Sequence, residues 1–393
     1  MQTFYIIGIS DNRNQFLSPE IRNLVSQGKV FSGGKRHHEL VHAYLPEDAV
    51  WIDITVPLDA VFCRYEEHPE IIVFASGDPL FFGFANTVMR KLPSAKIILF
   101  PTFNSLQMLA HRILLPYQEM QTLSLTGRPW DAFDSALIRG DKLIGVLTDR
   151  EKTPATIAAR MLEYGYDNYR MIVGEALGNG EEESVRTFSL EEASQSAFRF
   201  PNCLILQRNK VHPRPFGVPE SEFHLLNGRN KMITKMPVRL LTLSMLTLRE
   251  KKSFWDIGFC TGSVSIEAKL QFPELKVTAF EQRPKGKELM ERNSRKFGTP
   301  GITTVMGDFL ETELGGLPAP DAVFIGGHGG KMIEILQKIK EVLLPDGVIV
   351  FNSVSEESKA LFTKGITQIN KKVTQCTRIA VDAFNPIEIM RAE

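Results

Sequence analysis

The chain carries no net charge, because its 393 residues include 46 Lys and Arg against 46 Asp and Glu. Proteins that bind nucleic acid need an excess of cationic side chains to displace counterions from phosphates. The charge balance therefore argues against a nucleic-acid partner. It leaves room for a local basic pocket that binds an acidic small molecule.

Cysteine is scarce and widely spaced, with only Cys63, Cys203, Cys260 and Cys376. Their separations match no metal-ligand pattern, so we expect free thiols in a reducing compartment and no metal. No apolar run approaches the roughly 20 residues that cross a bilayer. The first residues also lack a basic segment followed by an apolar one. We therefore expect a cytoplasmic protein without a membrane partner.

Internal repeats, coiled-coil heptads and low-complexity tracts are also absent, and a chain of this length favours two domains. The polar stretch 208–219 contains three prolines and a glycine, which is typical of a linker between domains. We therefore expect one domain over residues 1–209 and a second over residues 210–393.

Short, unbroken apolar runs alternate with helical stretches in both halves, which indicates α/β sheets built from parallel βαβ units. In the first half we expect strands at 4–9, 71–75, 96–100, 142–147, 169–173 and 202–207, and helices at 81–91, 105–114 and 156–163. In the second half we expect strands at 252–257, 276–281, 303–306, 321–325 and 348–352, and helices at 263–270, 284–296 and 331–344.

A glycine-containing turn after the strand 252–257 is the strongest local signal of the second half. Glycines there let the backbone turn tightly and approach a ligand, and the next helix offers free N–H donors. The spacing is G-x-x-x-G, and the absence of G-x-G-x-x-G disfavours a nicotinamide-dependent oxidoreductase. Glu281 ends the next strand, where an acidic residue could accept ribose hydroxyls, and Gly307-Asp308 follows the strand after it and could sit beside an adenine. The candidate cofactor-binding residues are Asp256, Gly258, Gly262, Glu281, Gly307 and Asp308.

This arrangement resembles the class I S-adenosylmethionine methyltransferases. The segment 232–239 and the Gly-Gly-His-Gly-Gly element at 326–330 are similar, more narrowly, to the decarboxylating precorrin C15-methyltransferases. That family usually has a glycine where Cys260 stands and commonly a small residue where His328 stands. Cys260 is either a low-pKa thiolate or a small residue that fills the turn. His328 is either a substrate contact or an exposed loop residue.

Several residues of this half are candidates for gripping the carboxylates of a substrate. Lys235 and Arg239 lie four apart and would share a helix face, and a solvated face is the alternative. The candidates are Thr234, Lys235, Arg239, Gly327 and His328.

The first half resembles the tetrapyrrole (class III) methylases. Its Gly-Asp-Pro loop at 77–79 and the segments 101–107, 125–128 and 146–149 follow that family's order. Asp78 and Pro79 alone would also suit an N-cap and the first position of a helix. The resemblance implies these cofactor-binding residues: Gly77, Asp78, Pro79, Ser105 and Thr126.

Two further segments, 33–37 and 173–178, are similar to the branch of that family that methylates carbon 5. Arg36 lies in a basic cluster at 35–38 that suits a substrate with many carboxylates, and a solvated charge run is the alternative. The family's usual Gly-x-Gly-Pro-Gly is replaced here by the residues 8–12, at a loop that normally lies near substrate and cofactor.

The two methylase types, in this order, resemble the family of precorrin-6Y C(5,15)-methyltransferases (decarboxylating). The resemblance implies a tetrapyrrole methylase fold that methylates carbon 5. It also implies a Rossmann-like class I domain that methylates carbon 15 and removes the carboxylate of the ring C acetate. Each domain would bind its own S-adenosylmethionine, and the substrate would be a precorrin or cobalt-precorrin of cobalamin biosynthesis.

The resemblance names no catalytic residue, and we expect a homo-oligomer. It leaves open whether the substrate carries cobalt and which methylation comes first. The alternative is a class III methylase that acts on another substrate, with an inactive or scaffolding second domain.

Overall fold

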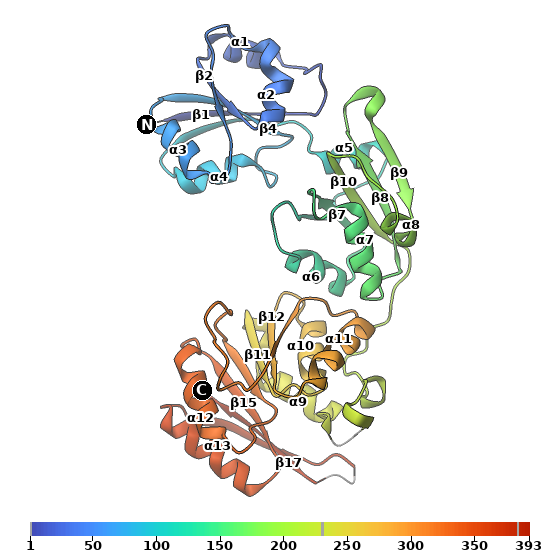
Figure 1. Cartoon of the computed structure of the whole chain (residues 1–393), viewed down its shortest axis with the longest axis vertical. Helices are drawn as coiled ribbons and strands as arrows, with labels where there is room; N and C mark the ends of the chain where they lie inside the picture. Colours follow the sequence, from blue (N-terminus) through green and yellow to red (C-terminus); the bar gives the residue numbers. More distant parts are fainter. Residues whose placement is uncertain (1, 229–231, 383–384) are drawn as a thin grey trace. The chain divides into compact units, whose positions relative to one another are not determined.

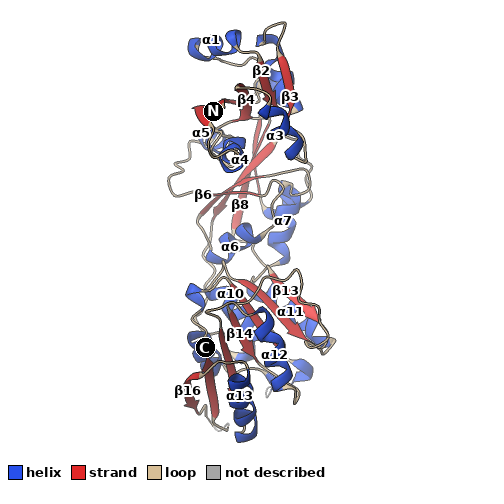
Figure 2. Cartoon of the chain, turned by 90° about the vertical axis from the view of Figure 1, so that its left-hand side faces the viewer, coloured by secondary structure: helices blue, strands red, loops and turns tan. Residues whose placement is uncertain are grey.

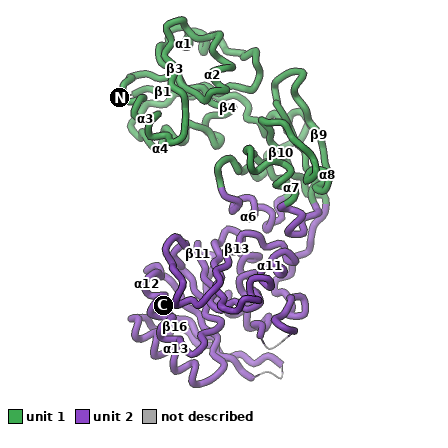
Figure 3. The backbone as a smooth tube through the Cα atoms, viewed as in Figure 1, with its two compact units in different colours: residues 1–128, 142–159, 169–209 green, residues 129–141, 160–168, 210–393 purple. Residues whose placement is uncertain are grey.

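The computed structural model describes residues 2–228, 232–382 and 385–393 (Figure 1). The chain divides into two compact units (Figure 3). Unit 1 contains residues 1–128, 142–159 and 169–209, and unit 2 contains residues 129–141, 160–168 and 210–393. Two segments of the first half therefore belong to unit 2, and the assignment of domains to 1–209 and 210–393 stays a prediction.

Unit 1 begins with a five-stranded, all-parallel sheet in the order β3-β2-β4-β1-β5. Its strands are β1 (Thr3–Ile9), β2 (Val30–Gly33), β3 (Val50–Asp53), β4 (Glu70–Ser76) and β5 (Lys96–Phe100). Its helices are α1 (Pro19–Gln27), α2 (Lys35–Val41), α3 (Asp59–Glu66) and α4 (Phe84–Lys91). The central strands are unbroken apolar runs, as expected for strands that are buried on both faces.

The second sheet of unit 1 is mixed, in the order β6-β7-β10-β8-β9. Its strands are β6 (Gln121–Ser124), β7 (Leu143–Leu147), β8 (Tyr169–Glu175), β9 (Ser184–Phe188) and β10 (Asn202–Arg208). Its β10 runs antiparallel to both β7 and β8. Helix α5 (Ser105–Arg112) packs Leu106 and Leu109 against this sheet. The remaining helices of the first half are α6 (Asp131–Arg139), α7 (Pro154–Glu163) and α8 (Leu190–Ser194).

Unit 2 contains a seven-stranded sheet in the order β13-β12-β11-β14-β15-β17-β16, in which only β17 runs antiparallel to its neighbours. Its strands are β11 (Ser253–Ile257), β12 (Lys276–Glu281), β13 (Ile302–Met306), β14 (Ala322–Ile325), β15 (Val348–Ser353), β16 (Val373–Ile379) and β17 (Ile387–Ala392). Its helices are α9 (Met236–Met245), α10 (Ser263–Gln271), α11 (Lys285–Phe297), α12 (Met332–Val342) and α13 (Glu356–Gln368) (Figure 2). The α/β prediction is confirmed for both halves.

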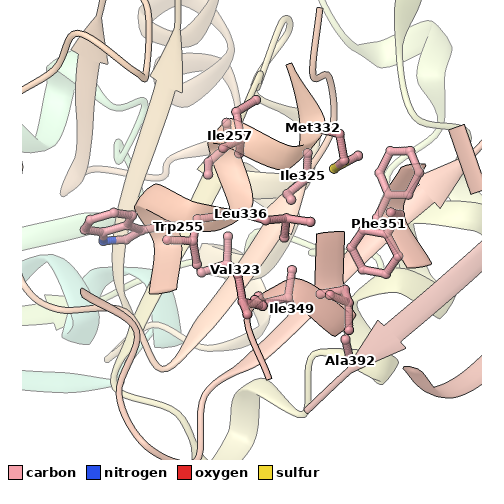
Figure 4. Packing of buried hydrophobic residues seen from close by; sticks show 14 of the residues in the cluster. Trp255, Ile257, Val323, Ile325, Met332, Leu336, Ile349, Phe351 and Ala392 are labelled. Atoms are coloured by element: carbon pink, nitrogen blue, oxygen red, sulfur yellow. The ribbon is translucent and has the colours of Figure 1, made fainter. Parts of the chain in front are cut away.

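Two hydrophobic clusters hold the unit 2 sheet, one on each face. On one face, Leu336 of α12 packs with Trp255, Val323 and Ile349 from three adjacent strands (Figure 4). The other cluster contains Val238 of α9 and Val264 of α10. Helices on both faces leave the carboxyl ends of the strands as the place where loops gather.

One predicted helix start is wrong. The helix expected from residue 81 begins at Phe84, with Gly83 as its N-cap. Phe82 has a φ of +54°, which is incompatible with a continuous right-handed helix. Asp78 therefore does not cap α4, and its Oδ1 accepts a hydrogen bond from the N–H of Leu80 at 2.9 Å instead. Pro79 accordingly lies in a turn and not at a first helical position.

Within the described ranges, no helix combines the length and the apolar character that crossing a membrane requires.

Candidate functional site

A cleft of about 790 Å³ lies in unit 2, lined by the loops that follow the carboxyl ends of the parallel strands. Its size is typical of a small-molecule site. Most of the predicted site residues of this half line it: Thr234, Lys235, Asp256, Gly258, Glu281, Gly307, Asp308, Gly327 and His328. Gly262 and Arg239 do not. The structure therefore brings together residues that are up to 94 positions apart in the sequence (328 − 234).

The turn after β11 needs its glycines for different reasons. A Cβ at Gly258 would lie 2.9 Å from the backbone nitrogen of Gly327, so the two loops approach each other through bare backbone. A Cβ at Gly262 would lie 2.5 Å from the Sδ of Met290, in the packing behind the turn. Gly258 therefore shapes the cleft, whereas Gly262 fits α10 onto its neighbour.

Cys260 takes a left-handed φ of +52°, a backbone conformation that favours glycine. Its N–H donates to Oε2 of Glu281 at 2.8 Å. Burial raises the pKa of the Cys260 thiol above its ordinary value, and the Arg283 cation opposes this less strongly. The structure thus favours a small residue that fills the turn over a reactive thiolate.

Asp256 presents an unpartnered carboxylate oxygen. The side chain is fully buried, and its Oδ2 accepts from the Oγ of Ser265 at 2.6 Å and from its N–H at 3.2 Å. Oδ1 has no hydrogen-bond partner. Burial raises the pKa of Asp256 to about 7, with a further contribution from the charge of Glu281. A buried acceptor without a donor indicates room for a donor from a ligand.

The other two acidic residues of the cleft have partners but keep acceptor capacity. Oε2 of Glu281 accepts from the N–H of Cys260 and from the guanidinium of Arg283 at 3.3 Å, and Oε1 accepts from the N–H of Arg283 at 2.9 Å. A carboxylate oxygen accepts a second hydrogen bond, so Oε1 of Glu281 can still receive a hydroxyl group. Asp308 forms a 2.8 Å ion pair with Lys331, which lowers the pKa of Asp308.

The predicted role of Arg239 as a substrate contact is not supported, because its side chain is fully buried away from the cleft. Its Nε lies 3.3 Å from Oε2 of Glu267, and one terminal nitrogen donates to the carbonyl of Thr234 at 2.8 Å. The other terminal nitrogen donates to the carbonyl of Val218. Lys235 is the N-cap of α9, so the expected shared helix face does not form. Arg239 instead holds the loop that carries Thr234.

His328 lines the cleft between flanking glycines. Its Nδ1 accepts from the N–H of Gly330 at 3.2 Å, so the neutral ring carries its proton on Nε2. Burial lowers the pKa of His328, which favours this neutral form. The ring packs edge-on against Phe351, with centroids 5.8 Å apart. The ring is therefore oriented at the cleft, as a substrate contact would require.

A second cavity, of about 470 Å³, lies in unit 1. The predicted residues Arg36, Gly77, Ser105 and Thr126 line it, and Asp78 and Pro79 do not. A Cβ at Gly8 would lie 1.9 Å from the carbonyl oxygen of Gly77, so the ends of β1 and β4 meet through bare backbone.

A polar cluster ties Arg36 to this cavity and rules out a purely solvated charge run. Arg36 Nε lies 3.4 Å from Asp11 Oδ1, and its terminal nitrogen donates to Ser76 Oγ at 3.2 Å. The N–H of Gly34 donates to Nδ1 of His37, so Nε2 of the neutral ring donates to Ser76 Oγ at 2.9 Å. Burial lowers the pKa of His37 to about 4. Asp11 belongs to the loop 8–12, whose sequence differs from the glycine-rich pattern of the family that this half resembles. In this chain the loop contributes the ion pair with Arg36.

Sequence reasoning missed several residues that line the unit 1 cavity. Ser10 and Asp11 belong to the loop at 8–12 and Phe103 to the segment 101–107, but none of them was named as a candidate, and Phe82, Phe200 and Asn202 lie outside the segments that carry the resemblance. A positive φ at Phe82 is not visible in its sequence. In the described part of the chain, no group of three or more His, Cys, Asp or Glu side chains is placed to hold a metal ion.

The chain aligns along most of its length with one kind of enzyme. Over 371 residues it is 32% identical to a Sinorhizobium precorrin-6Y C(5,15)-methyltransferase [decarboxylating], which covers 91% of this chain and 86% of the relative. The chain belongs to the family of precorrin-6Y C(5,15)-methyltransferases. Residues 227–392 also match the model of the precorrin methyltransferase domain.

Two further matches cover only part of this precorrin methyltransferase. The cobalt-precorrin-6B C(15)-methyltransferase (decarboxylating) of Salmonella typhimurium is 34% identical over 162 residues, which is 41% of this chain and 83% of the relative. A crystal structure of a precorrin-6Y C5,15-methyltransferase from Geobacter metallireducens is 33% identical, with a TM-score of 0.43. It covers 46% of this chain and 99% of that chain.

Proposed function

We propose that this chain methylates a precorrin macrocycle at carbons 5 and 15 with S-adenosylmethionine and removes the carboxylate of the ring C acetate, in cobalamin biosynthesis. The observation that carries the proposal is the similarity along 91% of the chain to a relative whose name states both methylations. Two separate cavities, one in each unit, support it. Names of relatives include both precorrin and cobalt-precorrin, so either form of substrate is considered.

In this proposal, residues 1–209 form the tetrapyrrole methylase domain for carbon 5, and residues 210–393 form the class I domain for carbon 15 and decarboxylation. The five adjacent parallel strands of unit 2, with loops around one cleft, support a Rossmann-like assignment. The precorrin methyltransferase domain model matches only residues 227–392, which supports the assignment of separate reactions to the two parts of the chain. The predicted homo-oligomer and cytoplasmic location stay predictions.

The residues of the unit 2 cleft fit S-adenosylmethionine. Oδ1 of Asp256 has no partner and can accept a hydrogen bond from a positively charged group of the cofactor. Glu281 can accept a hydrogen bond from a ribose hydroxyl. The bare backbone at Gly258 allows a ligand to approach closely. Gly307 and Asp308 would flank the adenine. The bound cofactor supplies an electrophilic methyl group, and the chain contributes binding, orientation and exclusion of water.

On the substrate side of the cleft, Thr234, Lys235, Gly327 and His328 would hold the macrocycle. His328 offers an Nε2–H donor to a carboxylate. The conjugated macrocycle is itself an electron sink for loss of a carboxylate, so decarboxylation requires the protein to position the acetate. We assign no catalytic residue.

In the unit 1 cavity, Gly77, Ser105 and Thr126 would hold the second S-adenosylmethionine, and Arg36 would bind a substrate carboxylate. Asp78 and Pro79 would act indirectly, by shaping the turn that presents Gly77.

The test is isothermal titration of the full chain with S-adenosylhomocysteine, in the wild type and in variants that close one cavity. Gly258→Val and Gly77→Val each force a side chain against neighbouring backbone, at 2.9 Å and 2.8 Å respectively. We expect two binding sites in the wild type and one in each variant. Gly315→Val is the control, because a Cβ at Gly315 meets no atom within 4 Å.

Each of the two variants should also lose methyl transfer at one carbon and keep it at the other. Gly258→Val should abolish methylation at carbon 15, and Gly77→Val should abolish methylation at carbon 5. A single binding site in the wild type would mean that one unit is inactive or a scaffold, and the claim of two activities would fall.

A further inference from the structure

Three phenylalanine rings stand exposed around the unit 1 cavity. Phe82, Phe103 and Phe200 come from separate loops and are 37%, 57% and 51% exposed, yet all three line the cavity. Because these three residues line the cavity and are also exposed to solvent, they lie at the opening of the cavity. Large apolar side chains gathered at the opening of a concave site are typical of a binding surface.

Two arginines accompany these rings. The guanidinium carbon of Arg128 lies 4.8 Å from the ring centre of Phe82, and that of Arg150 lies 5.5 Å from the ring centre of Phe200. Both arginines are exposed. Among the residues that the structure describes, neither guanidinium has an ion-pair partner. The carboxylate next to Arg150, that of Asp149, accepts the N–H groups of residues 127, 151 and 152 instead.

Phe82 also has a backbone conformation that a bulky residue rarely adopts, with a φ of +54°. Such conformations gather at ligand sites, where the surrounding structure holds them in place. No packing requirement of the core accounts for Phe82, because its ring is not buried. The residue thus combines an unfavourable backbone conformation with an exposed ring at a cavity.

We propose that Phe82, Phe103 and Phe200, with Arg128 and Arg150, form the surface that receives the substrate macrocycle for methylation at carbon 5. The conjugated part of the ring system packs against the phenylalanine rings. The guanidinium groups pair with the peripheral carboxylates of the macrocycle, which suit arginine in charge and in geometry. This inference rests on the proposed function and adds the binding surface to it.

The test uses the full chain with precorrin-6Y and S-adenosylmethionine, and follows the products at carbon 5 and carbon 15 separately by mass spectrometry. We expect Phe82→Gly and Phe200→Ala each to raise KM for carbon 5 about tenfold, which corresponds to the loss of one aromatic contact. Affinity for S-adenosylhomocysteine and methylation at carbon 15 should not change. Arg128→Gln and Arg150→Gln should raise the same KM and weaken its dependence on ionic strength.

Phe82→Gly is the decisive variant, because glycine adopts a positive φ freely and folding should not suffer. Leu114→Gly is its matched control, since Leu114 also has a positive φ, of +51°, is 90% exposed, and does not line the cavity. Phe16→Ala, at a ring that is 91% exposed away from the cavity, is the control for Phe200→Ala. Both controls should leave KM unchanged.

An unchanged KM for carbon 5 in both phenylalanine variants would overturn this inference and leave the proposed function standing. Weaker binding of S-adenosylhomocysteine in parallel with KM would also overturn it, because the rings would then serve the cofactor. If the wild-type chain forms no product methylated at carbon 5, the proposed function fails, and this inference fails with it.

Discussion

At Cys260 a side chain occupies a backbone conformation that glycine adopts more easily, with a φ of +52°. The left-handed conformation costs an L-residue about 1–2 kcal/mol, and glycine removes this cost. Glycine also gives the unfolded chain more conformational freedom, which offsets part of the stabilisation. We therefore expect Cys260→Gly to stabilise the protein by about 0.5–1 kcal/mol. Urea unfolding measures the change.

Cys63→Gly is the control for this substitution. Cys63 lies in α3 and is exposed, so glycine there should destabilise by about 1 kcal/mol. Opposite signs for the two substitutions support the conformational argument. A loss of stability at both positions would contradict it.

Asp256 makes the stability of the protein depend on pH. Burial raises its pKa to about 7, whereas an unfolded aspartate has a pKa of about 3.9. The folded state therefore binds this proton more tightly than the unfolded state does. The corresponding stability is fully present below a pH of about 4 and is lost as the pH rises to about 7.

Asp256→Asn removes this titration, so its stability should fall less steeply than that of the wild type between pH values of about 4 and 7. Urea unfolding over this range compares the two slopes. Asp346→Asn, at an exposed turn position, should keep the wild-type slope. An Asp256→Asn slope equal to that of the wild type would show that Asp256 stays ionised.

The candidate residues that the sequence predicted best are those at the carboxyl end of a strand. Asp256 and Glu281 reach the cleft because the carboxyl ends of parallel strands share one edge of the sheet. Arg239 was misjudged because its environment is set by Glu267, which is distant in the sequence. Spacing within one segment cannot reveal such a partner.

Among the helices and strands, α9 and α10 are joined by a buried ion pair with an unusual number of connections. Glu267 accepts from Arg239 and from the N–H groups of Gly217 at 3.1 Å and Val218 at 2.9 Å. Arg239 in turn donates to the carbonyl of Thr234 in the cleft. The segment before α9, the helix itself and α10 therefore depend on one another.

Arg239→Met should destabilise the protein by about 3–5 kcal/mol, because it leaves the carboxylate of Glu267 buried without its cation. Denaturant unfolding measures this loss. The double variant Arg239→Met with Glu267→Gln should be more stable than the sum of the single changes predicts, since both charges are then absent. If Arg239→Met kept wild-type stability and only raised KM, Arg239 would be a substrate contact after all.

Most strands of the sheets were predictable, since β5 and β12 match their expected bounds and the bounds of the other strands that were predicted differ by one or two residues. The elements that were not predicted are the strands β2, β3, β6, β9, β16 and β17 and the helices α1, α2, α3, α6, α8 and α13. Gly365 weakens the helical pattern of α13, but a Cβ there would lie 2.5 Å from Leu336 of α12, so close helix packing explains it. Strand β16 is mostly exposed and contains a register shift, which weakens its apolar signal.

At the scale of the whole molecule, the division into two units predicts that ligand binding stabilises each unit separately against unfolding. Each unit has its own cores and its own cavity, so the chain need not unfold in a single two-state transition. Residues 129–141 and 160–168 belong to unit 2 although they precede residue 210. The full chain is therefore the better material for this comparison than a cut at 209/210.

Calorimetric unfolding of the full chain should show two transitions, both raised by S-adenosylhomocysteine. At about 100 times the dissociation constant, the ligand adds about 2.7 kcal/mol to the stability of each unit that binds it. In Gly258→Val only one transition should still respond, and in Gly77→Val only the other. Gly315→Val should respond as the wild type does. A single transition that shifts as one in every variant would show that the units unfold together, and the two cavities would then be energetically coupled.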